Sequence, residues 1–173
     1  MIVHSDGVQA FGKIKVNLQH LGVDFYTISA HKIYAPRGIA GLWVKQGVVI
    51  DALLVGGGQE DSFRSSTENV AGALAFAFAS KKVVQELKNN FEKVEKIKLK
   101  LLNLLLNSQI STFLNINSID NSSPYILSLS LKDIKGEVLM NALASEGILI
   151  STGSACSSKH AGNRTLEAMK KPL

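Results

Sequence analysis

The sequence has little cysteine and few aromatic residues, and it contains no long apolar run. The single cysteine, Cys156, excludes an internal disulfide and any zinc site that uses several cysteines, and it fits a reducing, cytoplasmic compartment. The leucine-rich stretch 101–106 is far too short to cross a membrane. The first residues show no basic segment followed by an apolar run, so we expect neither a signal peptide nor a membrane anchor.

The charge pattern argues against a nucleic-acid partner. The net charge is +5, and many of the lysines lie between Lys81 and Lys100, where glutamates separate them and aromatic residues are scarce. Such a mixture is typical of the solvated face of a helix and not of a single-sign binding surface. With 46% hydrophobic and 19% charged residues in 173, the chain is expected to form a packed core.

Short strand-like runs separated by glycines fill the first part of the chain. Such closely spaced runs fit the edge of a larger α/β sheet. The pattern predicts a buried strand over Met1–Asp6, a helical turn over Asn17–Leu21 closed by Gly22, strands over Asp24–Ser29 and Gly41–Lys45, and a strand or tight loop over Val48–Val55.

Helical periodicity dominates the middle of the chain. An alanine-rich helix is predicted over Val70–Leu87 and a second over Phe91–Leu106, with a break at Asn89-Asn90. The domain boundary is expected at the same place, with residues 1–88 forming a partial large domain and residues 89–173 a smaller α+β domain. The second helix should direct its periodic apolar residues into a core, namely Val94, Ile97, Leu101, Leu104 and Leu105.

The smaller domain is predicted to mix strands and helices. Polar and glycine-containing segments separate its apolar runs, and the cysteine lies in a loop of small and hydroxylated residues near the end. The predicted elements are strands over Thr112–Ile116, Tyr125–Leu131 and Ile148–Ile150, a helix over Gly136–Ser145 with Val138, Leu139, Ala142 and Leu143 inward, and a last helix beginning near Asn163.

One segment stands out chemically. Ser29-Ala30-His31-Lys32 follows a predicted strand and precedes a turn over Ala35–Gly38. Partial burial favours the neutral amine of a lysine, and a neutral amine can react with an aldehyde. The hydroxyl of Ser29 and the imidazole of His31 suit a phosphate group. By itself, however, such a tetrapeptide is more often a solvated loop.

Three other pieces accompany this segment: Asp6 with Gln9, the run Arg64–Thr67, and Cys156. Each has an ordinary interpretation, because Asp6 alone suits a turn, Thr67 alone suits a helix cap, and a lone cysteine is usually a small buried apolar residue. The three glycines at 56–58 match neither common phosphate-loop pattern. Only in combination do these pieces fit one chemistry.

In combination they resemble the cysteine desulfurases of the class V aminotransferase family, which have fold type I and use pyridoxal phosphate (PLP). The resemblance implies an α/β fold in which a partial PLP-binding large domain is followed by a smaller α+β domain. The matching segments, in the family's order, are Asp6–Lys13, Asp24-Phe25 with Ser29–Lys32, Gly56–Glu60 with Arg64–Val70, and Ser151–Ser158.

The resemblance implies a function for each singled-out residue in the removal of sulfur from L-cysteine, which leaves L-alanine. Lys32 would form the Schiff base with the cofactor aldehyde, and Cys156 would take the sulfur as a persulfide for a sulfur-acceptor or scaffold protein. No metal is implied. The other cofactor contacts would be Asp6 to the pyridine nitrogen, Gln9 to the ring hydroxyl oxygen, Ser29 and His31 to the phosphate, and Thr67 to the phosphate of the partner subunit in a homodimer.

The chain also departs from the family. Family members are much longer; the N-terminal half and the C-terminal arginine segment that binds the substrate carboxylate have no counterpart here, and Ser66 stands where glycine is usual. The sequence therefore resembles the middle and later part of a desulfurase. Two alternatives stay open: a non-catalytic remnant that dimerises or binds a partner, and activity on selenocysteine. The acceptor pathway, iron–sulfur cluster assembly or tRNA thiolation, also stays open.

Overall fold

The computed structural model describes residues 1–118, 121–153 and 164–170. The chain divides into two compact units, Met1–Glu92 and Lys93–Leu173. The boundary lies four residues beyond the predicted one, inside the helix α2 (Val70–Leu106).

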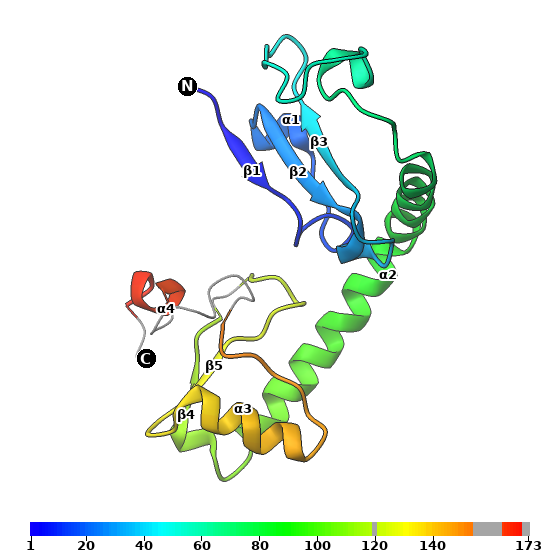
Figure 1. The fold of residues 1–173 in the computed structure, drawn as a ribbon. Coiled ribbons are helices and arrows are strands. Elements are labelled where there is room, and N and C mark those ends of the chain that lie inside the picture. The colour runs from blue at the N-terminus through cyan, green and yellow to red at the C-terminus, as the bar shows by residue number, and fades with distance from the viewer. Residues whose placement is uncertain (119–120, 154–163, 171–173) are drawn as a thin grey trace. The chain divides into compact units, whose positions relative to one another are not determined.

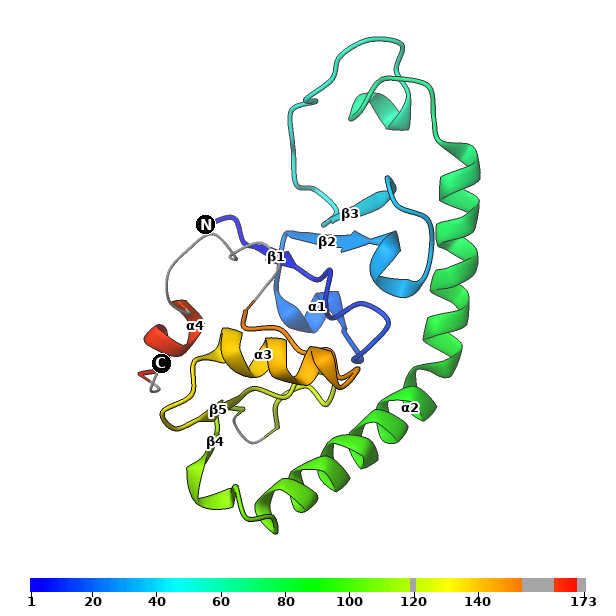
Figure 2. The same cartoon turned by 60° about the horizontal axis from the view of Figure 1, so that its bottom comes forward.

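Helix α2 is a single helix of 37 residues, drawn as one uninterrupted ribbon in Figure 2. The predicted break at Asn89-Asn90 is therefore wrong. An asparagine inside a helix costs only about 0.7 kcal/mol relative to alanine, and the segment has no proline to remove a backbone hydrogen bond. The loss of helix propensity at two positions is too small to end a helix of this length.

The first unit is built on a three-stranded sheet (Figure 1). Its strands are β1 (His4–Asp6), β2 (Phe25–Ser29) and β3 (Ala40–Val44), in that order. Strand β1 runs parallel to β2, and β3 runs antiparallel to β2. The predictions of β2 and β3 are confirmed to within one residue at each end.

The prediction of a buried strand over Met1–Asp6 is wrong in extent and in burial. Pairing begins at His4, and the side chains of Met1 and Ile2 are 112% and 69% exposed. Among the described residues, β1 pairs only with β2, so its outer edge carries no neighbouring strand. No described part of the chain covers the apolar residues Met1 and Ile2 next to that open edge.

Polar contacts fix the ends of the sheet. The Asp24 carboxylate accepts a hydrogen bond from the backbone N–H of Val3 (2.9 Å) and lies 3.6 Å from Lys45 Nζ, so it ties the start of β1 to the end of β3. The predicted helical turn is confirmed as α1 (Leu18–Leu21). The Asn17 side chain caps its start, and Gly22, at φ 71°, ends it.

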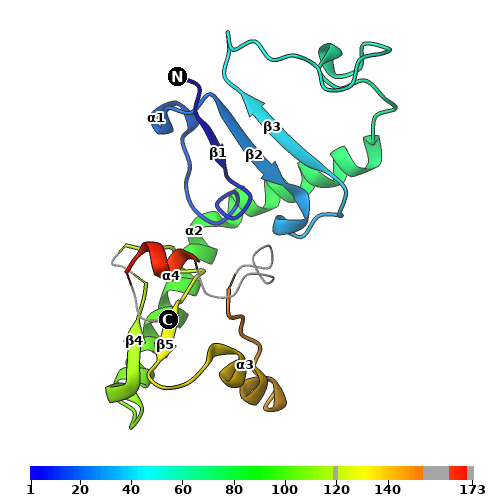
Figure 3. The same cartoon turned by 60° about the vertical axis from the view of Figure 1, so that its left-hand side comes forward.

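The core of the first unit lies between the sheet and the first part of α2, which Figure 3 shows beside the strands. The turn after β1 packs into it, because Phe11 meets Phe76 edge to face at 6.3 Å between ring centroids. Gly12, at φ 74°, fits where a Cβ atom would lie 2.8 Å from Val83 Cγ2. The buried apolar side chains of the unit are Val23, Tyr26, Ala30, Ile33 and Val83.

The chain between β3 and α2 is mostly irregular. Residues 48–55, for which the sequence left strand or loop open, form a loop with one isolated bridge between Leu54 and Arg64. The 3-10 helix η2 (Glu60–Ser62) follows the glycine run.

The second unit contains a two-stranded antiparallel sheet and short helices. After the 3-10 helix η3 (Ser111–Phe113), the strands are β4 (Leu114–Ile116) and β5 (Leu129–Leu131). Helix α3 (Gly136–Ser145) has the predicted bounds, and α4 (Arg164–Ala168) begins one residue from the predicted start. Strand β5 is shorter than the predicted Tyr125–Leu131.

No strand forms at 148–150, contrary to the prediction. Gly147 takes up a left-handed conformation at φ 76°, and the N–H of Ile148 donates to the carbonyl of Leu143 (2.9 Å). These bonds close α3 in the manner of a helix C-terminal cap. The apolar run Ile148–Ile150 therefore leaves a helix end, and no described strand pairs with it.

The predicted core of the second unit is also wrong in part. Leu139 and Leu143 are half-buried, but Val138 is 60% exposed, and on α2 Ile97 and Leu104 are 58% and 62% exposed. The buried residues of this unit, within the described ranges, are Asn117 and Pro124. Periodicity correctly predicted that these segments are helical, but nothing in the described part of the unit covers these apolar faces. None of the described helices is both long and apolar enough to cross a membrane.

Candidate functional site

The candidate residues of the first unit gather where β1 and β2 end. Because these strands are parallel, their carboxyl ends lie at the same edge of the sheet. Asp6 ends β1 opposite Thr27, and Ser29 ends β2 two residues later. The N–H of Gly7 donates to the carbonyl of Thr27 (2.9 Å), which extends the pairing into the turn after β1. The turn and the segment after Ser29 therefore start from one edge.

The segment after β2 is a 3-10 helix, η1 (Ala30–Ile33), where the sequence alone favoured a loop. Ala30 is 0% and Ile33 2% exposed. Residues three apart lie on the same side of a 3-10 helix, so these two side chains anchor η1 to the core. His31 and Lys32 consequently occupy its other sides, where His31 is exposed and Lys32 is half-buried.

Ser29 and His31 form a hydrogen-bonded pair, with 2.8 Å between Ser29 Oγ and His31 Nδ1. This contact holds the imidazole ring by one nitrogen and leaves Nε2 for another partner. In a neutral pair the tautomer decides which group remains as a donor to an anion such as phosphate, either the ring Nε2–H or the Ser29 hydroxyl. A doubly protonated ring would leave both as donors.

The Asp6 carboxylate is held by its own turn. Oδ1 accepts a hydrogen bond from the N–H of Val8 (2.9 Å), and the side chain is exposed. A carboxylate held in this way can accept a further hydrogen bond from a protonated ring nitrogen.

Tyr26 lies beneath this turn. The ring is 4% exposed, and its hydroxyl has no hydrogen-bond partner among the described residues. Burial and, second, the negative charge of Asp6 raise the pKa of Tyr26. A Cβ atom on Gly7 would lie 1.9 Å from Tyr26 Cζ, so only glycine lets the Asp6 turn pass over the ring. Gly7 lies in the matching segment Asp6–Lys13 and Tyr26 lies outside the matching segments, and the sequence alone indicated a function for neither residue.

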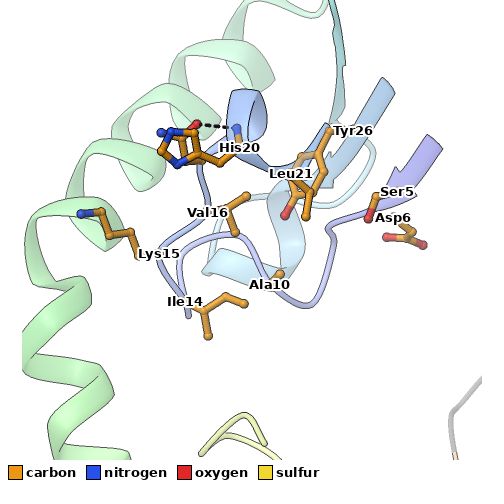
Figure 4. Close-up of a pocket in the computed structure, with 10 residues that line it drawn as sticks. Ser5, Asp6, Ala10, Ile14, Lys15, Val16, His20, Leu21 and Tyr26 are labelled. Carbon is orange, nitrogen blue, oxygen red and sulfur yellow. Dashed lines mark hydrogen bonds between the residues drawn. The ribbon is translucent and has the colours of Figure 1, made fainter. Parts of the chain in front are cut away.

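A hollow of about 410 Å³ opens on the side of the sheet that carries Ser5 and Tyr26 (Figure 4). Asp6 borders it, whereas Ser29, His31 and Lys32 do not. The hollow is thus separate from the group at η1. Its lining residues are Ser5, Asp6, Ala10, Ile14, Lys15, Val16, Asn17, His20, Leu21 and Tyr26.

Gln9 and Lys13 lie on the turn after β1. Lys13 Nζ donates to Gln9 Oε1 at 2.7 Å. Burial and, second, the positive charge of Lys32 lower the pKa of Lys13. The sequence analysis placed Lys13 inside a matching segment without a function, and its spacing of four residues from Gln9 is the signal that could have indicated the contact.

Of the two remaining predicted residues, the structure describes Thr67 and does not bring it to this group. Thr67 is exposed in the segment before α2, next to Ser66, whose Oγ accepts a hydrogen bond from Arg64 Nη1. No described contact joins Thr67 to Asp6, Gln9 or η1. Cys156 lies outside the described residues. In the part of the chain that the structure covers, no cluster of histidine, cysteine and acidic side chains could hold a metal ion.

Comparisons with known proteins match most of the chain to one protein family. The model of the family "Aminotransferase class-V" matches residues 1–169. Cysteine desulfurase IscS of Dictyoglomus turgidum is 36% identical over 155 residues, which make up 90% of this chain and 39% of that protein. The cysteine desulfurase of Nostoc sp. is 37% identical over 157 residues, again 39% of its length.

Solved structures of similar proteins superpose on this chain. A NifS-like protein from Rickettsia africae superposes with a TM-score of 0.83 at 30% identity, covering 99% of this chain and 45% of that one. Another NifS-like protein superposes with a TM-score of 0.78 at 38% identity, covering 88% and 41%. The predicted α/β fold class is confirmed. The chain spans less than half the length of the proteins it matches.

Proposed function

The chain belongs to the class V aminotransferase family, and we propose that it takes part in the PLP-dependent removal of sulfur from L-cysteine. The proposed products are L-alanine and a persulfide on Cys156. One observation carries the proposal: Asp6 and the Ser29–Lys32 segment, whose residue types suit the cofactor, lie at the ends of two adjacent parallel strands.

The residues at this edge fit the groups of PLP. Asp6 offers a carboxylate for the ring nitrogen, Gln9 an amide for the ring oxygen, and the hydrogen-bonded pair of Ser29 and His31 a donor for the phosphate. Lys32 offers a primary amine on a 3-10 helix anchored by two buried neighbours. When bound, PLP supplies an electron sink that stabilises negative charge at the substrate carbon next to the amine.

The chain's own residues would prepare that chemistry. The charge of Asp6 would keep the proton on the ring nitrogen, and the Lys32 amine would hold the cofactor and exchange protons with the substrate. Cys156 would act as a thiolate that accepts the sulfur atom, so that its S–H becomes S–SH while cysteine becomes alanine. In the sequence, Cys156 is surrounded by glycine, serine and alanine, small residues that suit such a thiol.

A homodimer is part of the proposal. Thr67 would reach the phosphate bound in the partner subunit, and α2 begins three residues after it. The first turns of α2 expose Val70, Leu74 and Phe78, by 61%, 67% and 74%. Residues four apart share one helix face, so these three side chains form an apolar stripe that supports a subunit contact. Sedimentation of the Leu74→Lys variant tests it: a dimer that persists contradicts the contact.

The cytoplasm is the proposed location, since a persulfide-forming thiol needs a reducing compartment. An acceptor protein for the sulfur, in iron–sulfur cluster assembly or tRNA thiolation, completes the proposal.

Cofactor trapping tests the function. The purified chain is incubated with PLP, reduced with borohydride, digested and mapped by mass spectrometry. We expect a phosphopyridoxyl group at Lys32 and its loss in Lys32→Gln, with Lys45→Gln as the control because Lys45 is an exposed lysine of the same unit. Label scattered over surface lysines would contradict the proposal. A desulfurase assay of the wild-type chain and of Cys156→Ser then tests the sulfur step.

A further inference from the structure

Lys13 lies beside the proposed cofactor residues without a function of its own. The backbone N–H groups of Lys13 and Ile14 both donate to the carbonyl of Ala10, at 3.0 and 3.1 Å. The turn is therefore helix-like, and it places residues 9 and 13 on one side. This placement brings Lys13 Nζ within 2.7 Å of Gln9 Oε1.

The turn is held against η1 and α2. A Cβ atom on Gly12 would lie 3.0 Å from Ile33 Cγ2 and 2.8 Å from Val83 Cγ2. Gly12 thus packs directly against the residue that follows Lys32. This packing fixes the position of Lys13 relative to η1, and the charge of Lys32 accordingly influences Lys13.

The two ends of the Gln9 amide differ chemically. Its carbonyl oxygen only accepts hydrogen bonds, and its NH₂ group only donates them. An ammonium group has three donors and no acceptor, so Lys13 can bind only the carbonyl end. The NH₂ end is left for another partner.

We propose that Lys13 is a positioning residue that holds the Gln9 carbonyl, so that the Gln9 NH₂ group is the end presented to the ring oxygen of the cofactor. The inference rests on the proposed PLP function. Without Lys13 the amide can rotate by half a turn and direct its carbonyl oxygen at the ring oxygen. A hydrogen bond to a charged oxygen would then be replaced by repulsion, and we expect PLP to bind about tenfold more weakly.

The test uses the whole chain of 173 residues and two readouts. In the absence of PLP, ¹H–¹⁵N spectra follow the side-chain NH₂ signals of Gln9, identified by their disappearance in Gln9→Glu. We expect Lys13→Met to move these signals toward the positions of a free glutamine, and Lys13→Arg to restore them, because arginine also only donates. Lys15→Met, two residues away and exposed, is the control and should leave them in place.

The second readout is PLP binding, followed by the absorbance maximum of the bound cofactor and its change with pH. Lys13→Met should weaken binding about tenfold and move the absorbance maximum, whereas Lys13→Arg and Lys15→Met should do neither. Trp43 fluorescence verifies that each variant is folded, and Lys13→Leu, which also lacks a donor, replaces Lys13→Met if that variant is not folded.

Failure of the inference about Lys13 can be distinguished from failure of the proposed PLP function. Gln9 signals that do not change in Lys13→Met overturn the inference whether or not PLP binds. A wild-type chain that binds no PLP overturns the proposed function and the inference drawn from it, while the Gln9 signals still report whether Lys13 holds the amide.

Discussion

The two units of the chain use their apolar residues differently. In Met1–Glu92, five apolar side chains are buried, and two of them, Ala30 and Ile33, lie on either side of the candidate residues His31 and Lys32. In the described part of Lys93–Leu173, the buried residues are Asn117 and Pro124, and Val138, Leu104 and Leu149 are largely exposed. Side chains can be held in a fixed geometry only where a packed core supports the backbone beneath them.

The comparison explains why the candidate site is well defined in the first unit. The site needs Asp6, Ser29 and Lys32 in fixed relative positions, and parallel pairing together with buried anchors provides that. The second unit shows that helices and strands can form while their apolar faces stay exposed. The following predictions test this difference, starting with the largest expected effect.

Removing a buried side chain should affect only the first unit strongly. Ile33→Ala leaves a cavity beneath η1 and should lower the free energy of unfolding by about 3 kcal/mol. The matched change Leu104→Ala removes a side chain that is 62% exposed and should cost less than about 1 kcal/mol. Urea unfolding, followed by circular dichroism and by the fluorescence of the only tryptophan, Trp43, measures both. Equal effects would remove the contrast between the units.

A methyl group should be tolerated at one glycine and not at the other. Gly7→Ala places a Cβ atom 1.9 Å from the Tyr26 ring and should cost about 2 kcal/mol, because the buried ring has little room to move. Gly136→Ala meets Thr152 Cγ2 at 3.1 Å and begins a helix, where alanine is the better residue. Its cost should be near zero in the same urea experiment. A Gly7→Ala variant as stable as wild type would refute the close approach.

Helix capping also distinguishes the units. Asn17 accepts hydrogen bonds from the N–H groups of Gln19 (3.0 Å) and His20 (3.1 Å), so Asn17→Ala should cost about 1 kcal/mol. Lys135, before α3, makes no capping bond with its side chain. Lys135→Ser should therefore raise stability by about 0.5 kcal/mol. Thermal unfolding measures both changes as shifts of the Tm. If the Tm of Asn17→Ala and that of Lys135→Ser shift in the same direction, the proposed difference in capping between α1 and α3 is wrong.

The smallest effect concerns the pH dependence of the first unit. Burial and Asp6 raise the pKa of Tyr26, so the folded chain holds the phenol proton more tightly than the unfolded chain does. This contribution to stability is complete below pH 10 and is lost as the pH rises above it. Tyr26→Phe should be at least as stable as wild type, because the hydroxyl it removes has no described partner, and its advantage should grow above pH 10.

Urea midpoints of wild type and Tyr26→Phe at pH 8 and pH 10.5 measure this difference. The lowered pKa of Lys13 acts in the opposite sense, since the folded chain disfavours the charged amine, but both proteins contain Lys13 and its effect cancels. If the stability advantage of Tyr26→Phe over wild type shrinks as the pH rises, the pKa of Tyr26 is not raised in the folded chain.

Much of this architecture could be predicted from the sequence because it depends on local signals. Asn17 and Gly22 mark the ends of α1, and the alternation and glycines around β2 and β3 define those strands. Helix α3 has its predicted bounds for the same reason. The segments that supply Asp6 and Lys32 could be recognised as motifs, and the structure places both at one sheet edge.

The wrong predictions, of burial and of the strand at 148–150, concern features that local sequence signals do not determine. Whether Met1 or Val138 is buried depends on what covers it, and periodicity carries no information about that. The run 148–150 resembles a strand, yet a strand also needs a partner. The contacts of Gly7 with Tyr26 and of Gly12 with Ile33 join residues about 20 positions apart, so they became visible only in three dimensions.

Hydrogen–deuterium exchange of the full-length chain, with and without PLP, tests the central claim most directly. The claim is that the first unit contains both the packed core and the cofactor site. We predict that without PLP the peptides covering β2 and η1 exchange more slowly than those covering α3. We also predict that PLP slows exchange further only in the peptides containing residues 5–13, 29–33 and 64–70. Equal exchange in the two units, or protection by PLP elsewhere in the chain, would contradict the account.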